Sequence, residues 1–208
     1  MAALPLPLNG ADLRLDQLIA ADYPRYRALY GDPRVAGPCG LDGGGEDALR
    51  TWFDAARSLP PSQGRAYALR HAGQERLAGV LRLTDWERHA GHLTLSYTLC
   101  PSLWGRGLMA GCLSPLLPWL FAGGLGEPIH RVQAWVLSGN QRSRRLLASL
   151  GFQHEGTLRG MLRLADGHHD ICAYGLLAVD LPNSQPLCQS GQPGPAPCWG
   201  LHSKEMPA

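Results

Sequence analysis

The sequence of 208 residues contains almost no lysine, and its opposite charges nearly cancel. Lys204 is the only lysine among 19 basic residues, against 17 acidic ones, which leaves a formal net charge of +2. Surfaces that bind nucleic acid need a clear excess of basic side chains to neutralise phosphates. A charge this small gives no reason to expect a nucleic-acid partner.

Neither a secretory leader nor a membrane span is expected from the sequence. Residues 1–8 are apolar but few, include two prolines and have no basic start. The longest apolar stretch, residues 108–125, is broken by Pro115, Pro118 and several glycines. We therefore expect a cytoplasmic protein with no membrane span. Residues 108–125 should form a buried helix that kinks or stops early near 114–118.

Patterns for metals and disulfides are missing as well. Six cysteines show no close paired spacing, which excludes a zinc motif and a small disulfide scaffold. Those in apolar segments are expected in the core: Cys100, Cys112 and Cys172. His168, His169 and Asp170 are consecutive, but neighbours on a strand point to opposite faces, so we expect no metal site.

The most informative segment covers residues 92–110. Apolar and polar residues alternate over 93–99, as in a strand with one buried face. Pro101 ends this strand, and Gly105 and Gly107 then open an apolar run of helical length. Glycine lets the backbone turn sharply, and the first amides of a helix have no partner within the helix. The segment predicts a turn that holds a phosphate or pyrophosphate.

Two common nucleotide motifs are absent from this turn. It lacks the G-x-x-x-x-G-K-[ST] pattern of P-loop proteins, and also the third glycine and downstream acid of the dinucleotide fold. The segment instead resembles the acyl-CoA loop of the GNAT acetyltransferase superfamily. Within it, the RimJ/RimL-type N-acetyltransferases often read Y-x-x-x-P-x-x-W-G-x-G. The matching residues are Tyr97, Pro101, Trp104, Gly105 and Gly107, while Met109 departs from the small residue usual at the end of the loop.

A second segment, residues 138–159, carries the same resemblance. The subgroup pattern is N-x-x-S, then a helix, then G-F-x-x-E-G-x-L-R. The matching residues are Asn140, Ser143, Gly151, Phe152, Glu155, Gly156, Leu158 and Arg159. In purely structural terms, Asn140 caps a helix that Gly151 ends. That interpretation explains the helix but not the joint occurrence of both motifs, which favours an acetyltransferase.

The resemblance implies the α/β (α+β) GNAT fold, a mixed and mostly antiparallel sheet with helices on both faces. Its two parallel strands, 93–99 and 130–136, would be splayed apart. The residue patterns also predict alternating strands and helices. Strands are expected at 13–18, 65–71, 76–84, 92–99, 129–137, 153–158 and 170–177, helices at 20–30, 46–58, 108–125 and 140–150, and a loop at 32–45. Residues 1–180 would form the catalytic domain, and the proline-rich residues 181–208 a flexible tail.

In this superfamily acetyl-CoA lies between the two splayed strands, and the resemblance implies its contacts. Main-chain groups of Tyr97, Thr98 and Leu99 would bind the acetyl carbonyl and the pantetheine arm. The pyrophosphate would lie on the backbone of Trp104, Gly105, Arg106, Gly107, Leu108, Met109 and Ala110. Asn140 and Ser143 would line the pantetheine and sulfur end. Acetyl-CoA is thus the expected acyl donor, with no metal.

Three residues are the catalytic candidates. Ser143 would protonate or hydrogen-bond the departing thiolate, and Tyr174 is the alternative, because a late tyrosine has this role elsewhere in the superfamily. Glu155 matches a family position and is a candidate base, although its place beside a glycine also suits a structural role. Further bases that the sequence does not rank are Asp85, Glu87, His130 and Asp170. Arg142, Arg144 and Arg145 suit either the 3′-phosphate of coenzyme A or a solvated helix face.

The lack of an obvious base bears on the acceptor. An α-amine titrates near pH 8 and is partly neutral at pH 7, whereas a lysine or polyamine amine titrates near 10.4 and needs a stronger base. The sequence therefore predicts direct acetyl transfer to a protein N-terminal α-amine. A small amine (polyamine, amino acid or antibiotic) is the alternative acceptor, and a non-catalytic acyl-CoA-binding module is another interpretation. Members of the subgroup are often dimers, so a homodimer is compatible, but no residue here specifies one.

Overall fold

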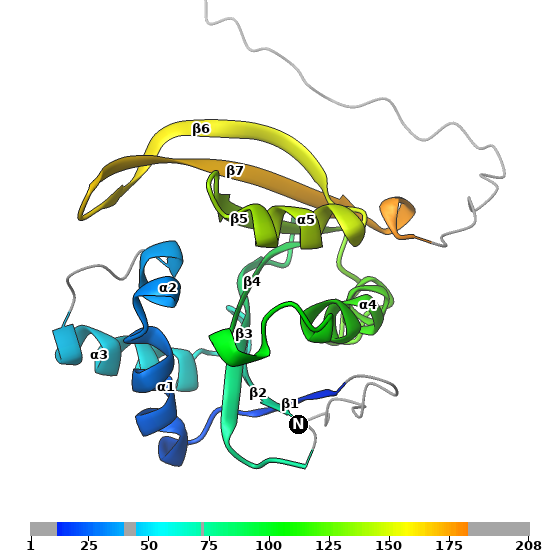
Figure 1. Ribbon diagram of the computed structural model, residues 1–208. Coiled ribbons are helices and arrows are strands. Elements are labelled where there is room, and N and C mark those ends of the chain that lie inside the picture. Colours follow the sequence, from blue (N-terminus) through cyan, green and yellow to red (C-terminus); the bar gives the residue numbers. More distant parts are fainter. Residues whose placement is uncertain (1–11, 40–44, 72, 183–208) are drawn as a thin grey trace, which may run out of the picture.

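A computed structural model describes residues 12–39, 45–71 and 73–182 as one seven-stranded sheet with helices on both faces (Figure 1). The strands are β1 (Leu13–Gln17), β2 (Arg65–His71), β3 (Leu77–Glu87), β4 (His92–Leu99), β5 (Arg131–Leu137), β6 (Gln153–Leu164) and β7 (Gly167–Leu177). The α-helices are α1 (Tyr23–Tyr30), α2 (Pro33–Ala36), α3 (Gly45–Arg57), α4 (Leu108–Phe121) and α5 (Gln141–Ser149). The short 3-10 turns are η1 (Ala20–Asp22), η2 (Gly37–Cys39), η3 (Pro101–Leu103) and η4 (Ala178–Asp180).

The two strands at the centre of the sheet run parallel and then separate. The strand order is β1-β2-β3-β4-β5-β7-β6, and every neighbouring pair except β4–β5 is antiparallel. β4 and β5 are paired only from His92–Thr94 to Arg131–Gln133, although the strands continue to Leu99 and Leu137. The predicted mixed sheet with splayed parallel strands is thus confirmed.

Alternation along the strands divides the core between the two faces of the sheet. On β3, Leu81 packs into a cluster with residues of α4 and α5, whereas Val80 packs into a second cluster with residues of α1 and α3. Figure 1 shows α1–α3 on one side of the sheet and α4 on the other. Arg82, two positions along β3 from Val80, therefore projects toward α1–α3 as well.

The prolines of α4 do not end it. The expected stop near 114–118 is wrong, because the helix is continuous to Phe121 with Pro115 and Pro118 inside it. Neither proline is buried, and Pro118 is exposed. The opposite face buries four leucines, which offsets the two missing backbone hydrogen bonds: Leu113, Leu116, Leu117 and Leu120.

Two connections differ from the sequence expectation. The loop expected at 32–45 contains α2 and η2, and α2 begins where the Asp32 carboxylate accepts a hydrogen bond from the Arg34 amide at 3.0 Å. The final hairpin is longer than expected, because a register shift between Leu158 and Leu162 lets β6 continue to Leu164. The longer hairpin brings Leu164, Ala165, Asp166 and His169 to the cavity described below.

Several sequence expectations concern features that are only partly described. No helix within residues 12–39, 45–71 and 73–182 is long and apolar enough to cross a membrane. The same residues contain no group of three metal-ligating side chains. Cys112 and Cys172 are buried as expected, whereas Cys100 is only partly buried. Most of the predicted tail, residues 183–208, lies outside the described part of the chain.

Candidate active site

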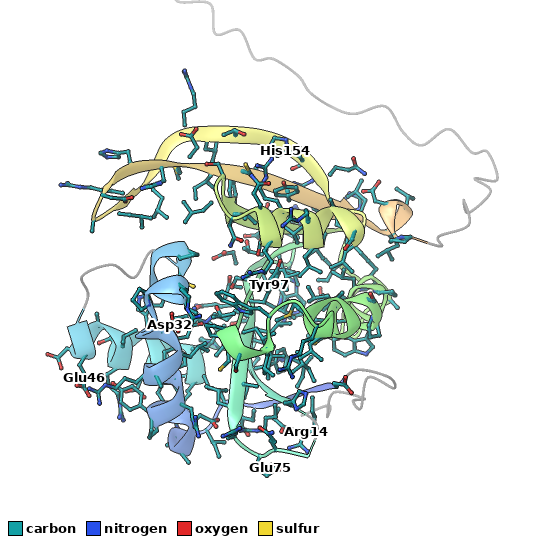
Figure 2. The ribbon with its side chains drawn as sticks, in the orientation of Figure 1. Arg14, Asp32, Glu46, Glu75, Tyr97 and His154 are labelled. Atoms are coloured by element: carbon teal, nitrogen blue, oxygen red, sulfur yellow. The ribbon has the colours of Figure 1, made fainter. Side chains whose placement is uncertain are left out.

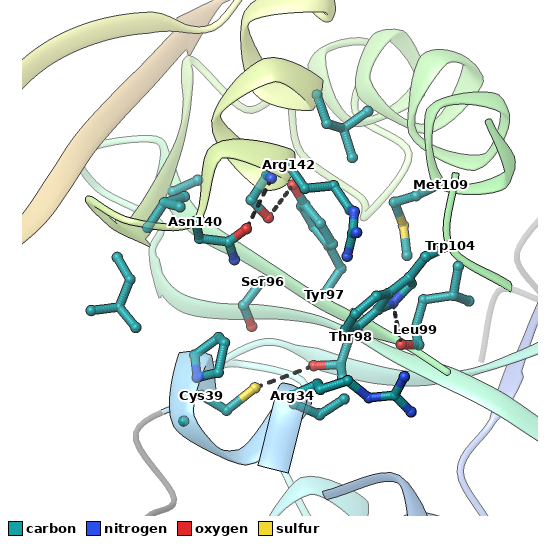
Figure 3. Close-up of a pocket in the computed structure, with 18 of the residues that line it drawn as sticks. Arg34, Cys39, Ser96, Tyr97, Thr98, Leu99, Trp104, Met109, Asn140 and Arg142 are labelled. Carbon is teal, nitrogen blue, oxygen red and sulfur yellow. Dashed lines mark hydrogen bonds between the residues drawn. The ribbon is translucent and has the colours of Figure 1, made fainter. Parts of the chain in front are cut away.

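A cavity of about 1130 Å³ lies where β4 and β5 separate. One side is formed by residues 103–110 and by α5, and the other by α2, η2, β3 and the tip of the β6–β7 hairpin. Every residue predicted to bind the coenzyme lines it: Tyr97, Thr98, Leu99, Trp104, Gly105, Arg106, Gly107, Leu108, Met109, Ala110, Asn140 and Ser143. Figure 3 shows these groups converging from β4, α5 and the start of α4.

The glycine turn leaves the first amides of α4 free for a ligand. Gly105 and Gly107 have φ values of 77° and 73°, in the left-handed region that favours glycine, and a Cβ at either position would meet no atom within 4 Å. Gly107 is the N-cap of α4, so no side chain caps the helix, and no acidic residue stands in its first turn. Free amides and the positive end of the helix dipole favour an anion here.

Trp104 fixes this turn against the sheet. Its indole Nε1 donates a hydrogen bond to the carbonyl oxygen of Leu99 at 2.7 Å. The guanidinium of Arg142 on α5 lies 4.3 Å from the centre of the indole ring, within the range of a cation–π contact (Figure 3). The tryptophan thus ties β4, the glycine turn and α5 together around the cavity.

A hydroxyl pair bridges the gap between β4 and α5. The side-chain oxygen of Asn140 accepts a hydrogen bond from the Ser143 amide at 3.1 Å, which caps α5 and orients Ser143. The Ser143 hydroxyl lies 3.1 Å from the hydroxyl of Tyr97 (Figure 3). Burial raises the pKa of Tyr97 to about 12, so its phenol stays protonated at neutral pH. Figure 2 shows Tyr97 below α5, near the middle of the molecule.

The backbone of β4 alternates between its two neighbours. The Cys100 amide donates to the carbonyl of Ala78 on the β3 side, so the backbone groups of Thr98 also face β3. Those of Tyr97 and Leu99 face the gap, and the Leu99 carbonyl there is taken by Trp104. The amide hydrogens of Tyr97 and Leu99 point into the gap between β4 and β5, whereas Thr98 lines the cavity with its side chain.

The resemblance implies that the loops around 31–45 and 85–91 and the final hairpin determine acceptor specificity, but no single residue of the opposite wall of the cavity was predicted as a site residue. This wall includes Arg82 on β3, Cys39 in η2, and Asp166 and His169 at the hairpin tip. The His169 Nε2 and Asp166 Oδ1 atoms are 2.6 Å apart, and His169 lowers the pKa of Asp166. Among the described lining residues, Asp166 is the only acid and His169 the only histidine. No local motif could have shown this wall, because its residues come from separate segments.

Two predicted catalytic residues lie outside the lining of the cavity. The Tyr174 hydroxyl accepts a hydrogen bond from Arg144 at 3.2 Å, and its ring packs against His154. Glu155 forms a bidentate ion pair with Arg131, which lowers the pKa of Glu155. Each side chain thus has a structural partner here, and a catalytic role for either stays a prediction.

The remaining candidate bases and arginines differ in whether they line the cavity. Asp85, Glu87, His130 and Asp170 do not line the cavity. Arg142 and Arg145 do line it, beside Arg106, and none of these three arginines has a carboxylate partner among residues 12–39, 45–71 and 73–182. Arg144 instead donates to the Ser138 carbonyl at 3.1 Å. The side of the cavity formed by residues 103–110 and α5 is therefore basic.

Known proteins resemble this chain in both sequence and fold. A family described as an acetyltransferase (GNAT) domain matches residues 12–153. YdaF of Bacillus subtilis (strain 168), a proposed ribosomal N-acetyltransferase, is 26% identical over 101 residues. That alignment covers 49% of this chain and 54% of YdaF, so it spans little more than half of that relative.

Solved structures extend the likeness over most of the chain. A proposed acetyltransferase from T. thermophilus is 30% identical with a TM-score of 0.66, covering 85% of this chain and 92% of that one. An acetyltransferase from Salmonella typhimurium modifies the N-terminal serine of a 50S ribosomal subunit protein. It is 20% identical with a TM-score of 0.69, covering 82% of this chain and 97% of that one. The second likeness shows the fold alone.

Proposed function

This chain belongs to the GNAT acetyltransferase family, and from that premise we propose that it transfers the acetyl group of acetyl-CoA to a protein N-terminal α-amine. It is an acyltransferase, and its likeness to YdaF together with the two RimJ/RimL-type motifs supports a place in that subgroup. The observation that carries the proposal is the Tyr97–Ser143 hydroxyl pair, 3.1 Å apart, at the gap between the splayed strands. This hydroxyl pair lies near the glycine turn and near the part of β4 that is not paired with β5, so it would be close to the thioester of a bound acetyl-CoA.

The coenzyme would bind along one side of the cavity. The amides at the start of α4 would hold the pyrophosphate, and Arg106, Arg142 and Arg145 would add positive charge around the phosphates. The pantetheine arm would run along the free edge of β4 toward Tyr97. A pyrophosphate at this point needs close approach to the backbone, which the open space around Gly105 and Gly107 provides.

The transfer needs stabilisation of two developing charges. As the amine nitrogen attacks the carbonyl carbon, negative charge grows on the carbonyl oxygen, where the Tyr97 or Leu99 amide would donate a hydrogen bond. One such donor contributes about 3 kcal/mol in other acyl transfers. As the carbon–sulfur bond breaks, the Ser143 hydroxyl would give its proton to the thiolate, so that coenzyme A leaves as the thiol, and the proton lost by the amine nitrogen would restore the serine hydroxyl. The Tyr97 phenol would donate to the Ser143 oxygen and so leave the serine hydrogen free for the sulfur.

The scarcity of carboxylates in the described lining of the cavity favours an α-amine acceptor. Asp166 is the only carboxylate among the described lining residues, and it is already paired with His169. A lysine or polyamine amine, protonated at neutral pH, would need a free base to lose its proton. An N-terminal α-amine titrates near pH 8, so a useful fraction arrives neutral. Holding it in line with the thioester would then supply much of the rate.

Thiol release from acetyl-CoA tests this proposal with matched acceptors. One peptide has a free N-terminus and no lysine, a second has a blocked N-terminus and one internal lysine, and the third acceptor is spermidine. We expect release of coenzyme A thiol with the first peptide only, and mass spectrometry should place the acetyl group on its α-nitrogen. Turnover confined to spermidine would favour the small-molecule alternative instead. Tight acetyl-CoA binding without turnover on any amine would favour a non-catalytic module.

A further inference from the structure

Arg82 stands in the cavity wall on the side away from the glycine turn. It lies opposite Ser96 in the β3–β4 ladder, and its side chain projects from the face of the sheet that α1–α3 cover. Ser96 is exposed, and both residues line the cavity. α4, which begins at the glycine turn, packs on the other face. Arg82 therefore faces the half of the cavity away from the glycine turn, which we call the acceptor half and which Cys39, Asp166 and His169 also line.

The guanidinium of Arg82 has only one hydrogen-bond partner within the described residues. Its Nη2 donates to the Tyr26 hydroxyl at 2.5 Å. Its Nε is buried and has no partner. The guanidinium carbon lies 5.8 Å from the centre of the Tyr30 ring and 5.4 Å from that of Trp52. No carboxylate in residues 12–39, 45–71 and 73–182 forms an ion pair with it.

The neighbours that could supply a negative charge are held neutral. Burial raises the pKa of Tyr26, of Tyr30 and of Cys39. Both phenols and the thiol are therefore protonated at neutral pH, and each offers Arg82 a dipole but no charge. A partly buried cation without a counter-charge is costly unless a ligand brings one.

We propose that Arg82 binds a carboxylate of the acceptor, so that the substrate is an amine with a carboxylate close to it. This inference rests on the proposed function and narrows it. It favours a protein N-terminus with an acidic side chain among its first residues, and it disfavours a polyamine, whose second cation Arg82 would repel. A planar guanidinium suits a carboxylate in particular, because its parallel N–H groups match the two carboxylate oxygens.

The coenzyme does not explain the free charge of Arg82. Its phosphates would meet the start of α4 together with Arg106, Arg142 and Arg145. Arg82 projects from the other face of the sheet, next to Cys39 and Tyr30 in the wall formed by η2 and α1. The two halves of the cavity thus carry separate positive groups, one for phosphates and one for a carboxylate.

Matched acceptors measure the preference for a carboxylate directly. We would compare kcat/KM for peptides with free N-termini that carry aspartate at the first, second or third residue with those for the same peptides carrying asparagine. Free serine and serine amide form a separate pair. A preference within the peptides identifies a side chain as the source of the carboxylate, whereas one confined to free serine identifies an α-carboxylate.

The expected result is a preference of roughly 10- to 100-fold for at least one acidic acceptor over its amide, as for a charge-assisted hydrogen bond. Arg82→Gln should bring this ratio close to one. Tyr26→Phe is the control, because it removes the hydrogen bond to Arg82, keeps the charge and lies outside the lining of the cavity; the ratio should survive in it. If Arg82→Gln does not fold, the wild-type ratios still show whether an acidic acceptor is preferred over its amide, and Tyr26→Phe still tests the environment of Arg82.

Three results would overturn the inference: no acidic acceptor preferred by the wild type, a preference that survives in Arg82→Gln, or its complete loss in Tyr26→Phe. Failure of the proposed function is a separate outcome, seen as absence of acetyl-CoA binding or of thiol release with every acceptor. If acetyl-CoA binds without turnover, calorimetric titration of the same acceptors into the coenzyme A-saturated protein gives the acid-to-amide ratio. Equal binding of acid and amide there would overturn the inference as well.

Discussion

Arg70 and Arg82 are arginines on neighbouring strands, and their surroundings differ. Arg70, near the end of β2, is buried and donates from Nη1 and Nη2 to the two carboxylate oxygens of Asp22, at 2.9 and 3.0 Å. It also reaches Asp16 at 3.1 Å and the Glu75 carbonyl at 2.5 Å. Arg82, in the middle of β3, has one neutral phenol as its partner in the described part of the chain.

The difference separates a charge that serves the fold from one that serves a site. The positive charge of Arg70 is neutralised by carboxylates from β1 and η1, so it links those elements to β2. Among the described residues, Arg82 links nothing of opposite charge, and it faces a cavity. A protein breaks the rule that buried charges are paired mainly where function requires it.

The largest expected effect is on the free energy of unfolding, when the charge of Arg70 and the charge of Arg82 are removed in separate variants. Arg70→Met should lower the free energy of unfolding by about 3–5 kcal/mol, because it leaves Asp22 buried without its partner. Arg82→Met should cost about 1 kcal/mol, because the lost hydrogen bond to Tyr26 is offset by removal of an uncompensated charge. Denaturant titration of both variants measures the difference. Equal losses would mean that Arg82 is as structural as Arg70.

A smaller effect extends the comparison to two hydroxyls on α5. Ser143 faces the cavity and Tyr97, whereas the Ser149 hydroxyl donates to the carbonyl of Leu146 at 2.7 Å and does not line the cavity. Ser143→Ala should lower kcat about 100-fold, as expected for loss of an acid at the leaving group. Its affinity for acetyl-CoA should change little. Ser149→Ala should keep the wild-type kcat, and a normal kcat in Ser143→Ala would remove Ser143 from the chemistry.

Alkaline titration sharpens the claim that the neighbours of Arg82 are neutral. The difference in ultraviolet absorbance between the folded wild type and Tyr26→Phe should show no tyrosinate near pH 8, because burial raises the pKa of Tyr26. A tyrosinate that appears near pH 8 and disappears in Tyr26→Phe would supply the missing counter-charge and contradict the account.

The same shifts set a direction for stability at high pH. Tyr97 keeps its proton in the folded protein up to about pH 12, whereas an unfolded tyrosine loses it near pH 10. Stability from this group is complete below pH 10 and is lost as pH rises from about 10 to 12, because the unfolded state then binds fewer protons. The loss is about 2–3 kcal/mol for a shift of this size. Tyr97→Phe should make the fall with pH shallower by that amount, and an unchanged slope would contradict it.

The smallest effect concerns an ion pair that is neither buried nor free. Glu155 and Arg131 are 40% and 28% exposed, and such pairs contribute less than about 1 kcal/mol. Glu155→Gln should change the free energy of unfolding by no more than that. Its kcat should fall far less than that of Ser143→Ala, since Glu155 does not line the cavity. A fall in kcat as large as that of Ser143→Ala would restore Glu155 as the base.

The grouping of the glycine turn, the end of β4 and the start of α5 around one cavity could be predicted from the sequence, because short stretches of contiguous backbone form them. The turn at 104–110 and the cap at Asn140 depend on residues a few positions apart, so spacing alone indicates them. On the opposite wall only the segments could be expected and not the residues, because Arg82, Cys39 and His169 meet only through the pairing of distant strands. The early stop of α4 was wrong for a related reason: burial of its leucines against the sheet outweighs the local cost of two prolines.

Calorimetric titration with acetyl-CoA tests the central claim most directly, using two substitutions of equal size. Gly107→Trp fills the open space at the turn and forces a left-handed backbone on a bulky residue, whereas Gly111→Trp adds the same bulk one turn further along α4, outside the cavity lining. With both variants folded by circular dichroism, we predict micromolar binding by the wild type and by Gly111→Trp, and none by Gly107→Trp. Undiminished binding by Gly107→Trp, or none by the folded wild type, would contradict the account.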